Sequence, residues 1–263
     1  QNGTKLYSIS TNLRSNQHFF KWYGGFFRAI LMQFDFFFVQ NKTTEELLKS
    51  IKINQVLFTG DTRFDRVVEN KDQLVVDQRL ASFVGESNSV FIAGSTWKED
   101  ILLLKELIGS NRFEKYIIAP HNVDEKHVTE LTSQLQCDFI RYSDQQADLK
   151  STNVIVVDTI GLLASAYSFG HVAYVGGGFS GSLHNILEPA VFGLPVVFGP
   201  KFSRFPEATA FINAGIGFSV KDQSELNTTL DKLTNNRQMI SSKSIAFVEA
   251  NQGATVKILN QSL

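Results

Sequence analysis

The chain has 263 residues, 43% of them hydrophobic and 19% charged, a composition that excludes a disordered chain and leaves room for two domains. Its 25 basic and 26 acidic side chains give a net charge of −1, and this balance predicts no nucleic-acid partner. One cysteine, Cys137, rules out an internal disulfide framework and fits a reducing compartment, while five scattered histidines predict no Cys/His metal site.

The first predicted elements are three short strands joined by two helices. Apolar runs at 6–9, 34–40 and 55–60 predict the strands, and the amphipathic segments 26–33 and 43–51 predict the helices. Because the chain opens on Gln1 and runs directly into a strand, we expect a fragment or processed chain whose true start lies elsewhere, with no signal peptide in view.

Phenylalanine is unusually common, and eight of the 23 lie between Phe19 and Phe38. Charged residues and the pair Gly24-Gly25 interrupt this segment, so it predicts no transmembrane helix. Two interpretations stay open. The aromatic side chains fill a core, as phenylalanine usually does, or an apolar and cationic helix surface rests on a membrane.

A polar run from Glu69 to Gln73 predicts the boundary of a second domain, in which strands and helices alternate. The predicted strands are 89–95, 115–120, 154–158, 171–177 and 195–199. The predicted helices are 72–84, 98–108 and 124–136. A helix is also predicted after each of the last three strands, and the tail from Ser224 onward is predicted to contain helices only. Continuous apolar strands separated by helices of this length predict an α/β fold with doubly wound parallel sheets covered on both faces.

Small or polar residues follow four of these strands, where parallel doubly wound sheets bind their ligands. The groups are Gly94-Ser95-Thr96, Pro120-His121, Asp158 to Gly161, and a glycine-rich turn after Val175. Each has a purely structural alternative, since Ser95 or Thr96 could cap the helix at Lys98, and Asp158 or Thr159 the helix at 161–168. Their coincidence at one sheet edge favours a nucleotide cleft.

The segment Val175–Pro200 reads VGGGFSGSLHNILEPAVFGLPVVFGP and predicts a strand, a glycine-rich turn, a short helix and a second strand. Glycines at 176, 177, 178 and 181 allow positive φ and close approach of a ligand, and a helix beginning near Asn185 would point its N–H groups at an anion. Such turns also occur for chain reversal alone. The trio His184, Asn185 and Glu188 favours a ligand site, with Glu188 suited to sugar hydroxyls because it would repel phosphate.

Together with GDTRFDRV (60–67), GSTWKED (94–100) and DTIGLL (158–163), this segment closely resembles the Kdo (3-deoxy-D-manno-octulosonic acid) transferases along nearly the whole chain. The resemblance implies a glycosyltransferase of the GT-B type, with two Rossmann-like domains of which the first is incomplete here. It implies that residues 1–68 belong to the acceptor domain and 69–245 form the donor-nucleotide domain. The last helix, 246–263, is expected to cross back to the first domain.

Family membership further implies inverting transfer of Kdo from CMP-Kdo to a lipid A precursor in lipopolysaccharide biosynthesis. The expected place is the cytoplasmic face of the inner membrane, bound peripherally or anchored through a missing N-terminus. No cofactor and no metal are implied. In the family the general base is a glutamate in the first half of the acceptor domain, which this chain is expected to lack.

The same resemblance assigns a set of donor-binding residues. They are Ser95, Thr96, Ile160, Gly161, Gly177, Gly178, Gly181, His184, Asn185 and Glu188. In this assignment the amides of Gly177 to Gly181, with Ser95 and Thr96, hold the phosphate or the sugar carboxylate, and Glu188 binds the ribose. His184 donates to the departing phosphate, and Ile160 and Gly161 flank the cytosine. Lys98 or Lys201 could add a positive charge.

Two departures from the family pattern affect this assignment. Many members carry a histidine and a glycine where this chain has Trp97 and Lys98, and arginine-bearing sequence where it has His121-Asn122. Two alternatives also stay open: a GT-B transferase or epimerase that uses a UDP-sugar, and a non-catalytic nucleotide-binding or membrane-docking module.

Overall fold

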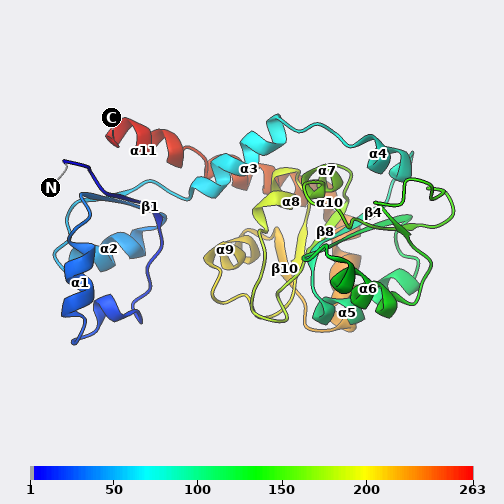
Figure 1. Ribbon diagram of the computed structural model, residues 1–263, viewed down its shortest axis with the longest axis horizontal. Coiled ribbons are helices and arrows are strands. Elements are labelled where there is room, and N and C mark those ends of the chain that lie inside the picture. The colour runs from blue at the N-terminus through cyan, green and yellow to red at the C-terminus, as the bar shows by residue number, and fades with distance from the viewer. Residues whose placement is uncertain (1–2, 263) are drawn as a thin grey trace. The chain divides into compact units, whose positions relative to one another are not determined.

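The computed structural model describes residues 3–262 and divides into two compact units. Unit 1 contains the chain up to Val68 and again from Glu249, and unit 2 contains Glu69–Val248. Each unit is built on its own sheet, and every strand pair in both sheets is parallel (Figure 1). The predicted α/β class with parallel sheets is confirmed.

Unit 1 has a three-stranded sheet in the order β1-β2-β3. Its strands are β1 (Tyr7–Thr11), β2 (Phe36–Val39) and β3 (Val56–Phe58). The helical elements are η1 (His18–Phe20), α1 (Gly25–Leu31), α2 (Lys42–Ser50), α3 (Thr62–Asp72), which reaches into unit 2, and α11 (Ala254–Ser262). The C-terminal helix is tied to α3 by Asp65, whose carboxylate accepts the amides of Gly253 and Thr255 at 2.6 and 2.7 Å.

The phenylalanine-rich segment divides into a buried part and an exposed part. Phe37 and Phe38 on β2 are buried in the core of unit 1, so the core interpretation is confirmed for them. Trp22 and Phe26, by contrast, keep 92% and 74% of their surface exposed. Within residues 3–262, no helix combines the length and the apolar character needed to cross a membrane.

Unit 2 has a seven-stranded sheet in the order β10-β9-β8-β4-β5-β7-β6. The strands are β4 (Val90–Thr96), β5 (Lys115–Pro120), β6 (Ile140–Arg141), β7 (Val154–Val156), β8 (Val172–Val175), β9 (Val196–Phe198) and β10 (Gly217–Ser219). The helices are α4 (Gln78–Val84), α5 (Lys98–Gly109), α6 (Glu125–Leu135), α7 (Leu163–Ser168), α8 (Leu187–Val191), α9 (Pro206–Ala214) and α10 (Gln223–Ala250).

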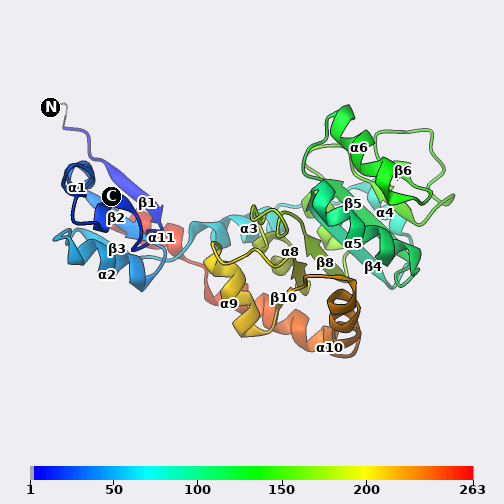
Figure 2. The ribbon, with the colours of Figure 1, turned by 90° about the horizontal axis from the view of Figure 1, so that it is seen from below.

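This strand order creates a switch point between β4 and β8, because the chain leaves β4 toward β5 and leaves β8 toward β9. Right-handed crossovers in opposite directions put their helices on opposite faces of the sheet. Accordingly, α5 packs against α6 (Figure 2), while α7 packs against α8 (Figure 1). The carboxyl ends of β4 and β8 therefore flank the crevice in which folds of this kind bind ligands.

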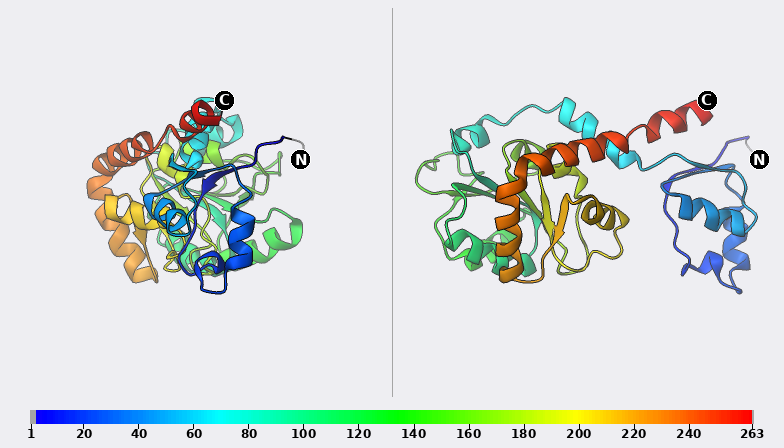
Figure 3. Two further views of the ribbon diagram at one scale, coloured as in Figure 1. Left: turned by 90° about the vertical axis from the view of Figure 1, so that its left-hand side faces the viewer. Right: turned by 180° about the vertical axis from the view of Figure 1, so that it is seen from behind.

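The structure corrects one predicted element and adds two strands that were not predicted. The helix expected at 72–84 is wrong, because residues 73–77 are not helical and Asp77 starts a new helix by accepting the amide of Leu80 at 2.8 Å. Strands β6 and β10 were not predicted, and they have only two and three residues. From Ser224 onward the described chain is helical apart from the turn between α10 and α11, as predicted, and α10 is bent (Figure 3).

Candidate functional site

The ends of β4, β5 and β8 come together at the switch point. Thr96 and Trp97 follow from β4, and Pro120 and His121 from β5. The glycine-rich turn begins directly after β8, and the Gly176 amide donates to the carbonyl of Gly94 at 2.9 Å. The ends of these three strands are thus neighbours, as the strand-end rule predicts.

Three aromatic rings, one from each strand end, form a stacked cluster that we call the ring cluster: Trp97, His121 and His184. The His121 ring lies 4.5 Å from Trp97 and 4.2 Å from His184, with nearly parallel planes in both pairs. Trp97 Nε1 donates to His184 Nε2 at 2.8 Å. Burial, and then the charge of His121, lower the pKa of His184 below its ordinary value, so the neutral imidazole is favoured.

Asp100, in the first turn of α5, connects the β4 end to the glycine-rich turn. Its Oδ2 accepts the Trp97 amide at 2.8 Å and the Gly177 amide at 3.2 Å, and its Oδ1 accepts the hydroxyl of Tyr174. The side chain is fully buried, and this burial raises the pKa of its carboxyl group. Neither Ser95 nor Thr96 caps α5; Trp97 occupies the N-cap position and Asp100 bonds back to it.

The glycine-rich turn is held by its own backbone more tightly than the sequence suggested. The Gly177 amide is bonded to Asp100, and the amides of Gly181 and Ser182 donate to the Gly177 carbonyl at 3.0 and 2.9 Å. At Gly178 an added Cβ would lie 2.4 Å from the nitrogen of Gly199, so a side chain there would push β8 and β9 apart. These glycines are therefore required by the packing of the turn itself.

An anion could still be bound at the tip of this turn. Within residues 3–262, the amides of Phe179 and Ser180 have no protein acceptor, and Ser180 is exposed. Lys201 lies beside the tip, since its Cβ and Cδ are 3.8 and 4.0 Å from the place where a Cβ of Gly181 would be. The helix expected to begin near Asn185 begins at Leu187 and has five residues, too short for a large dipole.

Asn185 and Glu188 are arranged as one polar unit next to this turn. Asn185 Oδ1 accepts the Leu187 amide at 3.1 Å, and its Nδ2 donates to Glu188 Oε1 at 3.1 Å. Burial raises the pKa of Glu188, an effect that the Asn185 hydrogen bond opposes. Glu188 keeps its second carboxylate oxygen for a ligand, which fits an acceptor of hydroxyl hydrogen bonds.

The fourth predicted group follows β7, which pairs with β5 on the side away from β4. Strand β5 separates β7 from β4, and Asp158 binds the amide and hydroxyl of Ser143 at 2.9 and 2.6 Å instead of capping a helix. Ile160 is 84% exposed and Gly161 has a φ of +92°. An exposed isoleucine on a glycine loop is a surface that a flat ring could cover.

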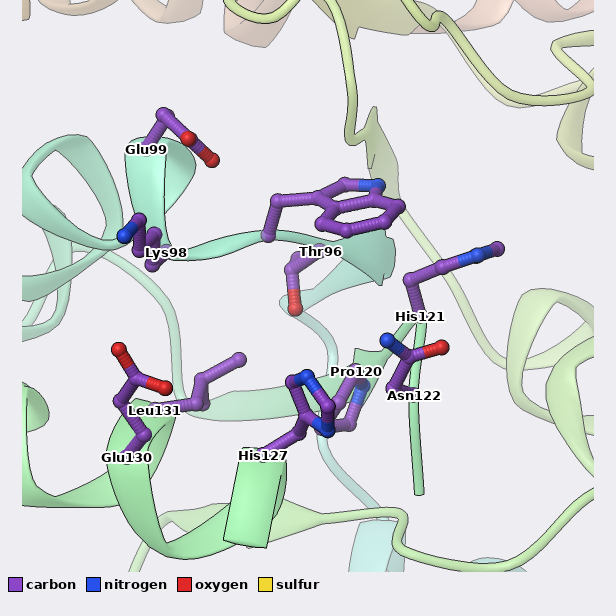
Figure 4. A pocket seen from close by; sticks show the side chains of 10 residues that line it. Thr96, Lys98, Glu99, Pro120, His121, Asn122, His127, Glu130 and Leu131 are labelled. Carbon is purple, nitrogen blue, oxygen red and sulfur yellow. The ribbon is translucent and has the colours of Figure 1, made fainter. Parts of the chain in front are cut away.

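Ser95 and Thr96 differ in what they offer. Ser95 has a φ of +52°, at an irregularity in the pairing of β4 with β5, and such a conformation in a non-glycine residue is concentrated at functional sites. The hydroxyl of Thr96 is buried and donates to the Ala119 carbonyl at 3.4 Å. Thr96 also lines a pocket of about 260 Å³ between the starts of α5 and α6, with Lys98, His121, His127 and Glu130 around it (Figure 4).

Sequence reasoning missed the roles of Asp100 and Trp97, and it placed His121 at a strand end without its ring contacts. Asp100 carried a local signal, because an acidic residue three positions after an N-cap is typical of a helix start. Its bonds to Tyr174 and Gly177 had no such signal, since 74 and 77 residues separate the partners. The ring cluster follows only from the sheet order.

The fold is that of a Rossmann-like α/β unit of the GT-B type. A UDP-N-acetylglucosamine 2-epimerase structure from Listeria monocytogenes matches 97% of this chain and 66% of its own with a TM-score of 0.66. At 15% identity this match concerns the fold alone.

No family model matches the sequence, but curated relatives do. A Kdo transferase from Rickettsia typhi is 26% identical over 275 aligned positions, 98% of this chain, and one from Aquifex aeolicus is 33% identical over 148. The solved CMP-Kdo binding domain of WaaA from Acinetobacter baumannii matches 68% of this chain and 96% of its own, with 25% identity and a TM-score of 0.55. The chain is thus a relative of the Kdo transferases, and the resemblance seen in its motifs is confirmed.

The relatives are longer than this chain. The alignment covers 57% of the Rickettsia typhi protein and 41% of the Aquifex aeolicus protein.

Proposed function

We propose that unit 2 binds CMP-Kdo and that the protein transfers Kdo to a lipid A precursor. The supporting observation is the β4/β8 switch point with its glycine-rich turn, in a chain of which 68% matches a CMP-Kdo binding domain. In this proposal the amides of Phe179 and Ser180 and the ammonium of Lys201 bind the anionic groups of the donor. The ribose hydroxyls donate to Glu188, and the base lies over Ile160.

The transfer is proposed to invert the anomeric carbon of Kdo. The acceptor hydroxyl oxygen bonds to that carbon and gives its proton to a general base. The bond between the carbon and the CMP phosphate oxygen breaks, and CMP leaves with the bonding electrons. Fixed positive groups near the phosphate would stabilise the charge that develops there.

A nucleotide titration tests the donor. Isothermal calorimetry with CMP, CDP and UDP should show tightest binding for CMP, and a preference for UDP rejects the proposal in favour of a UDP-sugar enzyme. Glu188→Gln should weaken CMP binding by about tenfold, the loss of a charged hydrogen-bond partner. The same change should have little effect on 2′,3′-dideoxy-CMP. Glu86→Gln is the matched control, because Glu86 is exposed in the loop after α4.

The acceptor side is proposed to meet a membrane through the exposed aromatic residues of unit 1. Trp22 and Phe26 are largely exposed, and Tyr23 and Ile30 next to them are 51% and 47% exposed. Aromatic side chains with basic neighbours such as Lys21 are suited to the membrane interface. A peripheral position at the inner membrane is the expected consequence.

Vesicle sedimentation tests this contact. The double change Trp22→Ala and Phe26→Ala should lower the fraction that sediments with phosphatidylethanolamine and phosphatidylglycerol vesicles. Leu102→Ala is the control, because Leu102 is an apolar side chain 68% exposed on α5 in unit 2. Equal sedimentation of the double variant and the wild type would reject the membrane contact.

A further inference from the structure

We propose that Trp97 is a positioning residue that fixes His184 in one tautomer, so that His184 presents a neutral Nδ1–H donor to the anionic part of the nucleotide ligand. This inference rests on the proposed function for the identity of the ligand. The tautomer itself follows from the protein alone.

The tautomer follows from the chemistry of the two partners. An indole Nε1–H is a donor and has no acceptor capacity, so in the 2.8 Å bond between Trp97 Nε1 and His184 Nε2 the imidazole nitrogen must accept. A neutral imidazole carries one N–H, and when Nε2 accepts, the proton sits on Nδ1. The imidazolium cation cannot take part, because both of its nitrogens donate.

The neighbours of His184 support the same state. His121 stacks on it at 4.2 Å, and a positive charge on either ring would disfavour one on the other. The contacts of the ring with side chains include Trp97, by a hydrogen bond, and His121, by stacking. In the described part of the chain, His184 Nδ1 has no protein acceptor, so its proton is available to a ligand.

The position of the ring suits this use. His184 belongs to the loop that follows the glycine-rich turn, and its Cδ2 lies 3.2 Å from the place of a Cβ at Gly177. The His184 amide donates to the Gly176 carbonyl at 3.2 Å, which holds the backbone of the residue against the turn. A donor fixed in direction before the ligand arrives loses little entropy on binding.

The tautomer can be measured without a ligand. Long-range 15N NMR of the histidine side chains at pH 7.5, assigned with His184→Asn, should show His184 protonated on Nδ1 and unprotonated on Nε2. In Trp97→Phe, which keeps an aromatic ring but has no N–H, the signals should move toward a mixture of both neutral tautomers. Trp22→Phe is the matched control and should leave them unchanged. Protonation at Nε2 in the wild type would overturn the inference.

Two substitutions of His184 then connect the tautomer to binding. His184→Asn places an amide N–H near the position of Nδ1, and His184→Gln places it near Nε2. We expect CMP binding to be about tenfold weaker in His184→Gln than in His184→Asn, the loss of a bond to a charged group. Trp97→Phe should weaken binding by about two- to fivefold, as the competent tautomer becomes less populated. It should have no further effect in the His184→Asn background.

The outcomes separate the inference from the proposed function. If the wild type binds CMP and the Asn and Gln variants bind equally, the role of His184 Nδ1 is rejected and the nucleotide assignment stands. If the wild type prefers UDP or binds no CMP, the proposed function fails, and the ligand part of the inference fails with it. A Trp97→Phe effect that persists in the His184→Asn background would mean that Trp97 acts through packing and not through the tautomer.

Discussion

Asp100 connects the segment after β4 to the glycine-rich turn after β8. Its carboxylate accepts hydrogen bonds from a backbone amide on each side of the switch point and from the hydroxyl of Tyr174. All of these donors are buried or partly buried, so water cannot easily replace the carboxylate. A charge buried without a basic partner is tolerated here because three donors satisfy it.

We expect Asp100→Ala to cost about 3 kcal/mol of stability, because it leaves three donors without an acceptor. Asp100→Asn should cost less than about 1 kcal/mol, since its carbonyl oxygen can accept both amides and the Tyr174 hydroxyl can turn from donor to acceptor. Urea unfolding of the two variants measures the difference. Equal losses of unfolding free energy in the two variants would contradict a stabilising role of these hydrogen bonds.

The lowered pKa of His184 predicts a dependence of stability on pH. Below a pH of about 6.5 the unfolded chain protonates this histidine, while the folded protein resists protonation until the pH reaches its lower, folded-state pKa. The unfolded state thus binds more protons in that window, and stability falls as the pH falls through it. In His184→Asn this contribution is absent, so its unfolding free energy should fall less steeply between pH 7 and 5. Parallel curves for the two proteins would contradict the prediction.

At the scale of elements, the close approach of two backbones after β8 and β9 sets the shape of the glycine-rich turn. Gly178→Ala would place a Cβ 2.4 Å from the Gly199 nitrogen, and we expect it to cost about 2 kcal/mol through overpacking. Gly109→Ala is the control, because no atom lies within 4 Å of an added Cβ at the end of α5. It should be neutral or stabilise by up to about 1 kcal/mol. Thermal unfolding of both variants makes the comparison.

Most elements of unit 2 could be predicted because their apolar runs are long and bounded by polar residues. Strands β4 and β5 and helices α5 and α6 appear within a few residues of their predicted positions. The prediction of a helix over 72–84 was wrong because Asp77 accepts the amide of Leu80 as an N-cap and so starts a new helix. The spacing of apolar residues carries no information about such a bond. Strands β6 and β10 form by pairing with β7 and β9, and neither lies in an apolar run like those that indicated the other strands.

The candidate site was predictable to the extent that the strand-end rule applies. It brought Thr96, His121 and His184 together correctly, because β4, β5 and β8 are neighbours in the sheet. It could not give the order of the strands, so the position of β7 beyond β5 is known only from the structure. The strand-end rule also could not show which amides of the glycine-rich turn are free to bind a ligand, because the Gly177 amide already donates to Asp100.

At the scale of the whole molecule, the chain leaves unit 1 after Val68 and returns to it at Glu249, shortly before the C-terminal helix. Asp65 binds the amides of Gly253 and Thr255 across 188 and 190 residues, at the start of α11. We expect Asp65→Ala to increase hydrogen exchange in 254–262 by about tenfold, since two charge-assisted bonds at a helix start are lost. Exchange in β8 should not change. Asp72→Ala, an exposed change on the same helix α3, is the control, and equal exchange in the two variants would contradict the assignment.

The sequence contains two tryptophans, and they lie in different units. Trp22 is almost fully exposed, whereas Trp97 is partly buried and hydrogen-bonded to an imidazole, so their fluorescence should differ in wavelength and intensity. Single replacements with phenylalanine would leave one emitter in each unit. The protein therefore has a natural optical reporter in unit 1 and another beside the ring cluster of unit 2, without any added dye.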